Sequence, residues 1–219
     1  MTNLRIGTWN LEGRWDSRHL ALMLHEDCDI WLLTEANERT ALQGYFAHRS
    51  RGDMAPGRAW AQILSRRELV PLDDPHPASA AAVVDGVPCC SSILPWRGCG
   101  PNPPWIEGSH GDRTRHAVDQ LAASLVPAPM IWGGDWNHAL SGDERAGSKA
   151  GRGHVAALVQ TWGLQVPTAA LPHRIAGLLS IDHIAVPITW SATARRVVAE
   201  SDGARLSDHD AYVVDVVRA

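Results

Sequence analysis

The sequence predicts an α+β fold or a two-sheet sandwich. Short apolar segments typical of strands outnumber helical ones, and they do not alternate strictly with helices. A doubly wound parallel sheet needs that alternation, because each parallel crossover takes a helix. With 219 residues, 45% of them hydrophobic, the chain is long enough for one large domain with its own core, which we expect to span residues 1–219.

In the first half of the chain, apolar periodicity predicts strands and one helix. The predicted strands are Leu4–Trp9, Asp29–Thr34, Ala59–Ser65, Glu68–Leu72, Ala80–Val84 and Val87–Leu94. Ser17–His25 is predicted to be an amphipathic helix. We expect two hairpins, one turning at Arg66-Arg67 and one at Asp85-Gly86, because Asp-Gly favours two-residue turns.

The second half mixes loops, helices and strands. Pro95–Pro104 is rich in proline and glycine and is predicted to be a loop. Arg113–Leu125 and His154–Trp162 have helical periodicity, and Gly163 follows the second as a cap. The predicted strands are Met130–Gly134, Leu178–Val186, Thr189–Val198 and Ala211–Val217.

Composition excludes several classes of protein. The net charge of −4 argues against a surface coated with basic residues, although a local basic groove remains compatible with it. The four cysteines form no C-x-x-C pair, so we expect free thiols rather than a structural zinc site. A strand pattern from Leu4 leaves no room for a signal peptide, and no apolar run reaches about 18 residues. We therefore expect a cytoplasmic protein without membrane association, and nothing indicates an obligate protein partner.

Acidic and amide residues gather at the ends of predicted strands. Two such groups lie in the second half, Gly133-Gly134-Asp135-Trp136-Asn137 and Leu206-Ser207-Asp208-His209-Asp210. Hard divalent cations prefer oxygen ligands, and a histidine titrates near neutral pH. These residue types together indicate metal-assisted hydrolysis, with a phosphate ester as the expected substrate.

Five short motifs follow one another along the chain: Trp9-Asn10, Thr34-Glu35, Gly134-Asp135-Trp136-Asn137, Ser180-Ile181-Asp182-His183-Ile184 and Ser207-Asp208-His209. In this order, and within a match that runs from Arg5 to Val217, they resemble the endonuclease/exonuclease/phosphatase superfamily, which has the DNase I-like fold. The resemblance implies a four-layer α/β/β/α sandwich with the site at one end of two packed sheets.

The resemblance also implies roles for individual residues. Glu35 would be the main ligand of Mg²⁺ or Mn²⁺, supported by Asn10 and Asp208. Glu12 stands where some nuclease branches have a metal-binding or metal-orienting aspartate.

The remaining motif residues would act on water and phosphate. Asp135 would orient or deprotonate the attacking water, and Asn137 would hold the phosphate or keep Asp135 in register. His209 would bond a non-bridging phosphate oxygen or transfer a proton, while Asp182 would fix its tautomer.

One segment departs from the family pattern. Many relatives carry a histidine, or a tyrosine and an asparagine, where this chain reads Cys89–Trp96, which contains no histidine or tyrosine. Ser91 or Ser92 could offer a hydroxyl to a phosphate oxygen but not an acid with a pKa near 7. A water at the metal, or a loop histidine such as His110, could then protonate the leaving group, although an isolated loop histidine is more often an ordinary surface residue.

Three further residues are candidates for substrate binding. Trp96 and Trp136 could stack on a base or sugar, although core packing explains a tryptophan more often. Arg145 lies in a Gly-rich loop that is either a phosphate-contacting lip or a solvated connection.

The sequence therefore predicts a Mg²⁺- or Mn²⁺-dependent phosphoesterase. A phosphodiesterase or nuclease acting on nucleic acid or a nucleotide-like substrate is the first hypothesis. A phosphomonoesterase on a small molecule and a catalytically impaired binding protein on the same fold are the alternatives.

Overall fold

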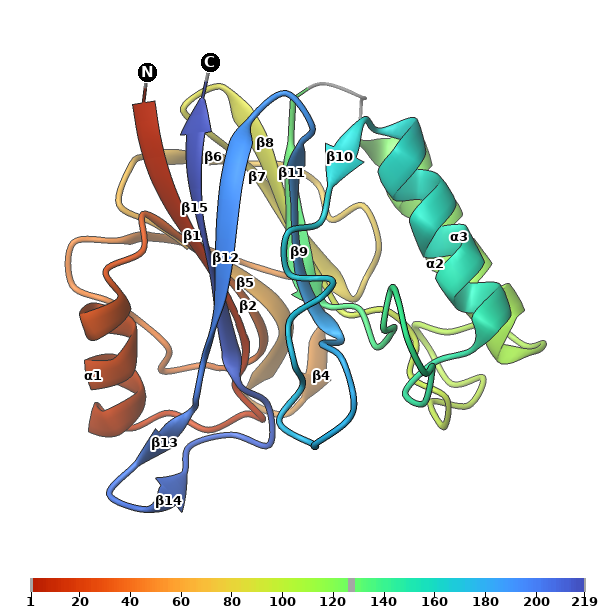
Figure 1. Cartoon of the computed structure of the whole chain (residues 1–219), viewed down its shortest axis with the longest axis horizontal. Coiled ribbons are helices and arrows are strands. Elements are labelled where there is room, and N and C mark those ends of the chain that lie inside the picture. Colours follow the sequence, from red (N-terminus) through yellow and green to blue (C-terminus); the bar gives the residue numbers. More distant parts are fainter. Residues whose placement is uncertain (1, 126–128, 219) are drawn as a thin grey trace.

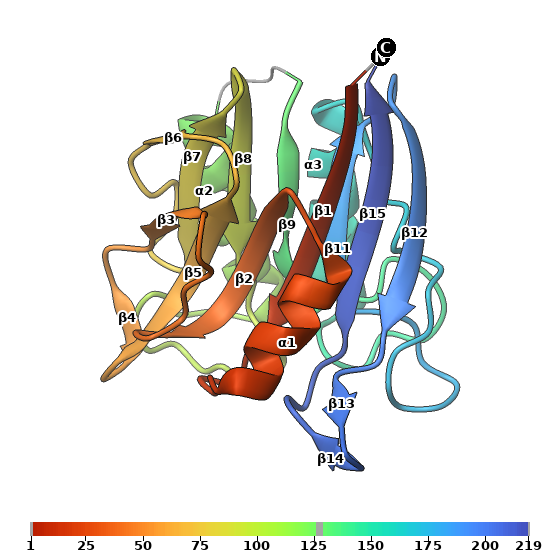
Figure 2. The same cartoon turned by 90° about the vertical axis from the view of Figure 1, so that its left-hand side faces the viewer.

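The structure is a computed structural model that describes residues 2–125 and 129–218. In it the chain folds into four layers. Helix α1 (Ser17–Glu26) covers one face of a seven-stranded sheet (Figure 2). That sheet packs against a six-stranded sheet, and helices α2 (His110–Ser124) and α3 (Lys149–Thr161) cover the far face of the second sheet (Figure 1). The expected α/β/β/α sandwich is confirmed.

The seven-stranded sheet has the order β12-β15-β1-β2-β5-β3, with β4 also paired to β5. Only β1 and β2 run parallel, and every other pairing is antiparallel. Its strands are β1 (Thr2–Asn10), β2 (Ile30–Asn37), β3 (Phe46–Arg49), β4 (Asp53–Ala55), β5 (Arg58–Ser65), β12 (Ser191–Val197) and β15 (Ala211–Arg218).

The six-stranded sheet has the order β10-β11-β9-β8-β7-β6. Here β8 and β9 run parallel, while β11 runs antiparallel to β9. Its strands are β6 (Leu69–Pro71), β7 (Ser79–Val84), β8 (Val87–Ser92), β9 (Ile131–Asp135), β10 (Leu164–Gln165) and β11 (Asp182–Pro187). A small ribbon of β13 (Glu200–Ser201) and β14 (Ala204–Arg205) precedes β15.

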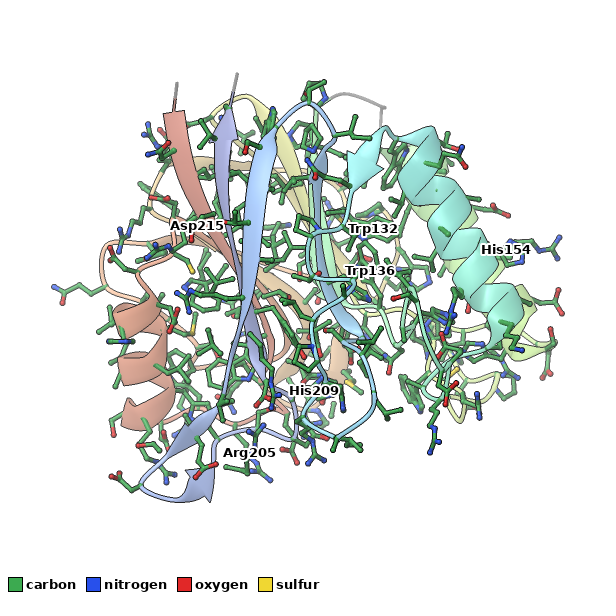
Figure 3. The ribbon with its side chains drawn as sticks, viewed as in Figure 1. Trp132, Trp136, His154, Arg205, His209 and Asp215 are labelled. Carbon is green, nitrogen blue, oxygen red and sulfur yellow. The ribbon has the colours of Figure 1, made fainter. Side chains whose placement is uncertain are left out.

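Three apolar layers hold these elements together. Aliphatic side chains of both sheets, such as Ile6 and Ile184, form the layer between them. A second layer, built around Trp9 and Trp31, lies under α1. Trp132 and Trp136 belong to the third, between the six-stranded sheet and helices α2 and α3 (Figure 3). Each large buried side chain contributes about 1.5–3 kcal/mol by leaving water.

Some predicted elements are confirmed and others are wrong. Asp85 and Gly86 form the expected turn, both with positive φ, between paired Val84 and Val87. The hairpin through Arg66-Arg67 does not exist, because β5 and β6 lie in different sheets and the chain crosses between the sheets there. Strands β3 and β4 and the two-residue strands β10, β13 and β14 were not predicted.

Element boundaries also differ from the predictions. Strand β11 begins at Asp182, so the residues from Leu178 to Ile181 form a loop. Both later helices begin earlier than predicted, after the caps Ser109 and Ser148. His110 is consequently the first residue of α2 rather than a loop residue. No helix in the described parts of the chain is long and apolar enough to cross a membrane.

Candidate active site

The candidate residues meet at one end of the two sheets. Parallel β1 and β2 both end there, which brings Asn10 and Glu35 together. Strand β9 ends there at Asp135, and antiparallel β11 begins there, with Asp182 opposite Asp135. The loop before β15 supplies His209, which lies far from the start of β1 and the end of β15 (Figure 3).

Asp135, Asp182 and His209 form a buried group that we call the histidine side. His209 Nδ1 lies 2.7 Å from Asp182 Oδ2, and His209 Nε2 lies 3.9 Å from Asp135 Oδ2. Within the described residues, this is the one set of three acidic or histidine side chains whose ligand atoms lie within 4.8 Å of one another. The other oxygen of Asp182 is buried without a hydrogen-bond partner there, so its charge acts mainly on His209.

The histidine side holds one imidazolium between carboxylates. Burial lowers the pKa of His209, but the charges of Asp182 and Asp135 and the hydrogen bond to Asp182 outweigh it and raise the pKa to about 10. Burial, together with the charges of Asp182 and Glu35, raises the pKa of Asp135 to about 7. Near neutral pH the site therefore combines a charged acid with a carboxylate that can take up a proton.

Asn137 supports Asp135 through its backbone. Its N–H donates to Asp135 Oδ1 over 3.0 Å, and its own side chain donates to the Leu94 carbonyl over 3.0 Å. The backbone of Asn137 is left-handed, with φ of 52°, a conformation that asparagine tolerates better than most residues. Of the two expected roles, this geometry fits keeping Asp135 in register.

Asn10 has a different orientation from that of a metal ligand. Its Nδ2 donates to Glu35 Oε1 over 3.1 Å and to Asp135 Oδ2 over 3.0 Å, while its Oδ1 accepts the Glu12 N–H. A flipped amide would turn its oxygen toward two carboxylates and its NH₂ toward an N–H, so the three contacts fix the assignment. In this conformation Asn10 bridges two carboxylates, and its role as a metal ligand stays a prediction.

Glu12, Glu35 and Asp208 form the second half of the site, which we call the glutamate side. Glu12 accepts the Asp208 N–H at Oε2 and pairs with Arg14 at Oε1, both over 3.0 Å. Glu35 Oε2 lies 2.8 Å from Nη1 of Arg58, a residue that the sequence did not single out. Unlike the histidine side, this half is partly open to solvent, with the Asp208 side chain 53% exposed.

The glutamate side fits a divalent metal ion by its chemistry. It offers several carboxylate oxygens, the donors that Mg²⁺ and Mn²⁺ prefer. Glu35 already holds a cation, the Arg58 guanidinium. In the described residues, the carboxylate oxygens of Glu12, Glu35 and Asp208 do not all lie within 4.8 Å of one another. The three side chains would therefore have to move closer together to bind one ion.

Two of the four expected substrate-binding residues lie in the core. Trp136 is fully buried with its ring centroid 4.0 Å from that of Trp132. Ser92 is also fully buried, and its hydroxyl accepts the Trp132 indole N–H. Neither side chain can contact substrate from there, so both expectations are wrong for this conformation.

The other two expected residues lie beside clefts. Trp96 lines a cleft of about 260 Å³ together with Glu35, Asp135 and His209. Arg145 is exposed and lines a second cleft of about 380 Å³ with Arg174 and, again, His209. His209 is the one lining residue that the two clefts share.

His110 does not face either cleft as a free acid. Its Nδ1 contacts the Ser148 hydroxyl and its Nε2 the Pro95 carbonyl, both at 2.9 Å. Both ring nitrogens are therefore engaged in joining α2 to neighbouring loops. The suggestion that His110 protonates the leaving group is not supported by this geometry.

Comparisons with known proteins agree with the geometry. Residues 7–209 match the model of the endonuclease/exonuclease/phosphatase family, a span that contains all five motifs. No curated protein sequence matches the chain.

Solved structures are similar in fold at low sequence identity. One is the endonuclease domain of TRAS1, a telomere-specific non-LTR retrotransposon, with a TM-score of 0.70, 14% identity and 98% of each chain covered. Another is an AP endonuclease from Archaeoglobus fulgidus, with a TM-score of 0.67, 15% identity, and 96% of this chain and 98% of that chain covered. An endonuclease/exonuclease/phosphatase from Beutenbergia cavernae has a TM-score of 0.67 and 15% identity, covering 98% of this chain and 71% of the other.

Proposed function

The chain belongs to the endonuclease/exonuclease/phosphatase family, and from this membership we propose that it is a divalent-metal-dependent phosphodiesterase acting on nucleic acid or a nucleotide-like substrate. The observation that carries the proposal is the arrangement around His209. A buried imidazolium lies between a carboxylate that fixes it and a second carboxylate with a pKa near 7. Hydrolysis of a phosphoester needs a group that takes a proton from water and a cation near the phosphate.

Each residue then has a defined task. Asp135 takes the proton of the attacking water, since a base with a pKa near 7 is matched to neutral pH. His209 donates a hydrogen bond from Nε2 to a non-bridging phosphate oxygen, and Asp182 holds the ring through Nδ1. Asn10 and the Asn137 backbone orient Asp135.

Glu35, Glu12 and Asp208 would hold Mg²⁺ or Mn²⁺. A bound ion of this kind would neutralise the negative charge that develops on the phosphate during hydrolysis. The protein's own contribution on this side is to supply the oxygen donors and to fix Glu35 through Asn10.

The two clefts favour a diester over a monoester. A phosphodiester carries a substituent on each side of the phosphorus, whereas a monoester carries only one. Clefts that share only His209 give each substituent a place beside the reacting phosphate. Two of the similar structures are endonucleases by name, which supports nucleic acid as the substrate class.

The proposal is tested with matched substrates and several metals. We expect bis(4-nitrophenyl) phosphate to be hydrolysed with Mn²⁺ or Mg²⁺ in preference to 4-nitrophenyl phosphate, and EDTA to abolish the activity. Plasmid DNA, single-stranded DNA, RNA, abasic duplex, dinucleotides, inositol phosphates and sphingomyelin then identify the natural class.

The control for this panel is His209→Ala. Wild-type protein as inactive as His209→Ala on every substrate would mean that the fold serves binding instead of catalysis. A preference for the monoester would replace the proposal with a phosphomonoesterase, and full activity in chelator would remove the metal from it.

A further inference from the structure

Arg58 occupies a position that the proposed reaction does not use. It is the first residue of β5 and pairs in register with Asn37, two positions after Glu35 on β2. This register brings the guanidinium to the end of β2, where Nη1 lies 2.8 Å from Glu35 Oε2. The Arg58 side chain is 35% exposed, so its outer face remains in contact with solvent.

The loop after β1 passes close to Arg58. A Cβ at Gly13 would lie 2.4 Å from Arg58 Nε and 2.8 Å from its Cζ, so a larger residue there would push the flexible end of the Arg58 side chain aside. Gly13 also has φ of 69°, a left-handed conformation that glycine adopts without strain. Its N–H donates to the Glu35 carbonyl, which ties the loop to the same strand end. Arg58 therefore contacts Glu35 on one side and lies against the loop after β1 on the other.

Both oxygens of Glu35 are engaged by protein donors. Asn10 donates to Oε1 and Arg58 to Oε2. A guanidinium has no acceptor atom and stays protonated, so Arg58 cannot become a ligand of a metal ion. A divalent cation at Glu35 would have to displace Arg58 or bind beside its positive charge, and both alternatives weaken metal binding.

We propose that Arg58 is an internal counter-cation, which competes with the divalent ion for Glu35 and is released toward the substrate phosphate when the ion binds. This inference rests on the proposed function, because it assigns the ion to Glu35. Glu35 lines the same cleft as Asp135 and His209, so a guanidinium that leaves Glu35 starts next to the cleft in which the phosphate would react. Arginine suits this second contact because its planar donors match phosphate oxygens.

The first test measures metal binding without any substrate. Mn²⁺ is titrated into wild-type protein and Arg58→Gln, and bound ion is followed by calorimetry or by loss of the free-ion electron paramagnetic resonance signal. We expect Arg58→Gln to bind Mn²⁺ about tenfold more tightly, the order of effect of removing one positive charge near a divalent ion at a protein surface. Arg58→Lys keeps the charge and should stay within about threefold of wild type by the same reasoning.

The matched control for metal binding is Arg39→Gln. Arg39 is an exposed arginine that follows the same strand and contacts the Asn37 side chain instead of a carboxylate. It should leave the Mn²⁺ affinity unchanged. If Arg58 only held Glu35 in a metal-ready position, Arg58→Gln would bind Mn²⁺ as wild type does or more weakly, and either result overturns the inference.

The second test measures the released guanidinium. With Mn²⁺ saturating, inorganic phosphate should bind Arg58→Gln about tenfold more weakly than wild type, the order of one lost charge-assisted contact. Tighter metal binding combined with weaker phosphate binding is a pattern that loss of local structure does not produce. Unchanged phosphate affinity would overturn the release step.

Neither titration depends on turnover. Failure of the proposed function would appear as inactivity on the whole substrate panel, whatever the Mn²⁺ affinity. Failure of this inference alone would appear as an active enzyme whose Mn²⁺ affinity does not respond to Arg58.

Discussion

The histidine side and the glutamate side of the site differ in how far the protein alone completes them. Asp182 and His209 are 1% and 13% exposed and make a 2.7 Å hydrogen bond to each other. On the glutamate side, the arginine partners of Glu35 and Glu12 are 35% and 52% exposed. Buried charges are fixed by their partners, whereas exposed pairs exchange easily with water and ions.

This difference fits the division of work in the proposed function. Proton transfer needs groups held at fixed distances away from bulk water, and the histidine side is the more buried half. Metal binding would need carboxylates that can change partners, and the carboxylates of the glutamate side are the more exposed ones. Asn10 joins the two halves, since one amide nitrogen donates to both Glu35 and Asp135.

The largest effect is expected from removing the base of the histidine side. Asp135→Asn keeps the size of the side chain but cannot accept a proton, so kcat at pH 8 should fall about 1000-fold, within the usual range for a general base. Mn²⁺ affinity should stay close to wild type, because Asp135 is not among the proposed ligands. Kinetics on a generic diester and a Mn²⁺ titration measure the two quantities.

The same variant separates function from folding. The pKa of Asp135 is raised from 3.8 to about 7 in the folded state, so the folded state loses stability as the pH rises between these two values, and the full loss is present above about pH 7. Asp135→Asn should therefore melt no lower than wild type at pH 8. Asp119→Asn on the outer surface of α2 is the matched control for both measurements. More than a tenth of wild-type activity in Asp135→Asn would mean that another group takes the proton.

A smaller effect is expected from weakening the support of His209. Asp182→Asn removes the charge that keeps His209 protonated, and loss of such a supporting partner typically costs about 10- to 100-fold in activity. In wild type, activity should rise as Asp135 ionises near pH 7 and fall as His209 loses its proton near pH 10.

The pH–rate profile of kcat/KM distinguishes this role from a structural one. In Asp182→Asn the alkaline fall should move to lower pH, because the pKa of His209 drops when a negative neighbour is removed. A uniform loss of activity with both limbs unmoved would show that Asp182 only packs against the ring.

The predictable parts of the fold were those with local signals. The Asp85-Gly86 turn has a signal in two adjacent residues, and it was predicted correctly. The turn at Arg66-Arg67 looks the same in sequence whether the next strand returns to its sheet or crosses to the other, so periodicity could not separate the two. Strands β3 and β4 are short and partly exposed, and they carry no apolar alternation.

The N-terminal cap of α2 did have a sequence signal that the prediction overlooked, since Ser109 and Asp112 form a capping box.

In the site, too, the residues with a local sequence signal were predicted, and those that depend on the assembled sheets were not. The motifs predicted which residues gather around Asp135, because each motif marks a strand end. Period-two alternation could have shown that Trp136 points away from its neighbours Asp135 and Asn137, and therefore into the core. Arg58 had no such signal. Its contact with Glu35 depends on the β2–β5 register and on the close passage of Gly13, which are properties of the assembled sheet.

The smallest effect is expected at Arg14, and it tests whether Mn²⁺ binding depends on the arginine at Glu35 in particular or on any arginine beside the glutamate side. Arg14 is as positive as Arg58, but it pairs with Glu12 and is 52% exposed. Arg14→Gln should change the free energy of unfolding by less than about 1 kcal/mol, as is usual for exposed ion pairs. Its Mn²⁺ affinity should rise by less than about threefold, because Arg14 and Glu12 are 52% and 31% exposed and solvent screens their interaction more than that of Arg58 with Glu35. Thermal melts and the Mn²⁺ titration used for Arg58→Gln provide the comparison. If Arg14→Gln tightened Mn²⁺ binding as much as Arg58→Gln, the total positive charge near the site would explain both results, and the contact between Arg58 and Glu35 would have no special part in metal binding.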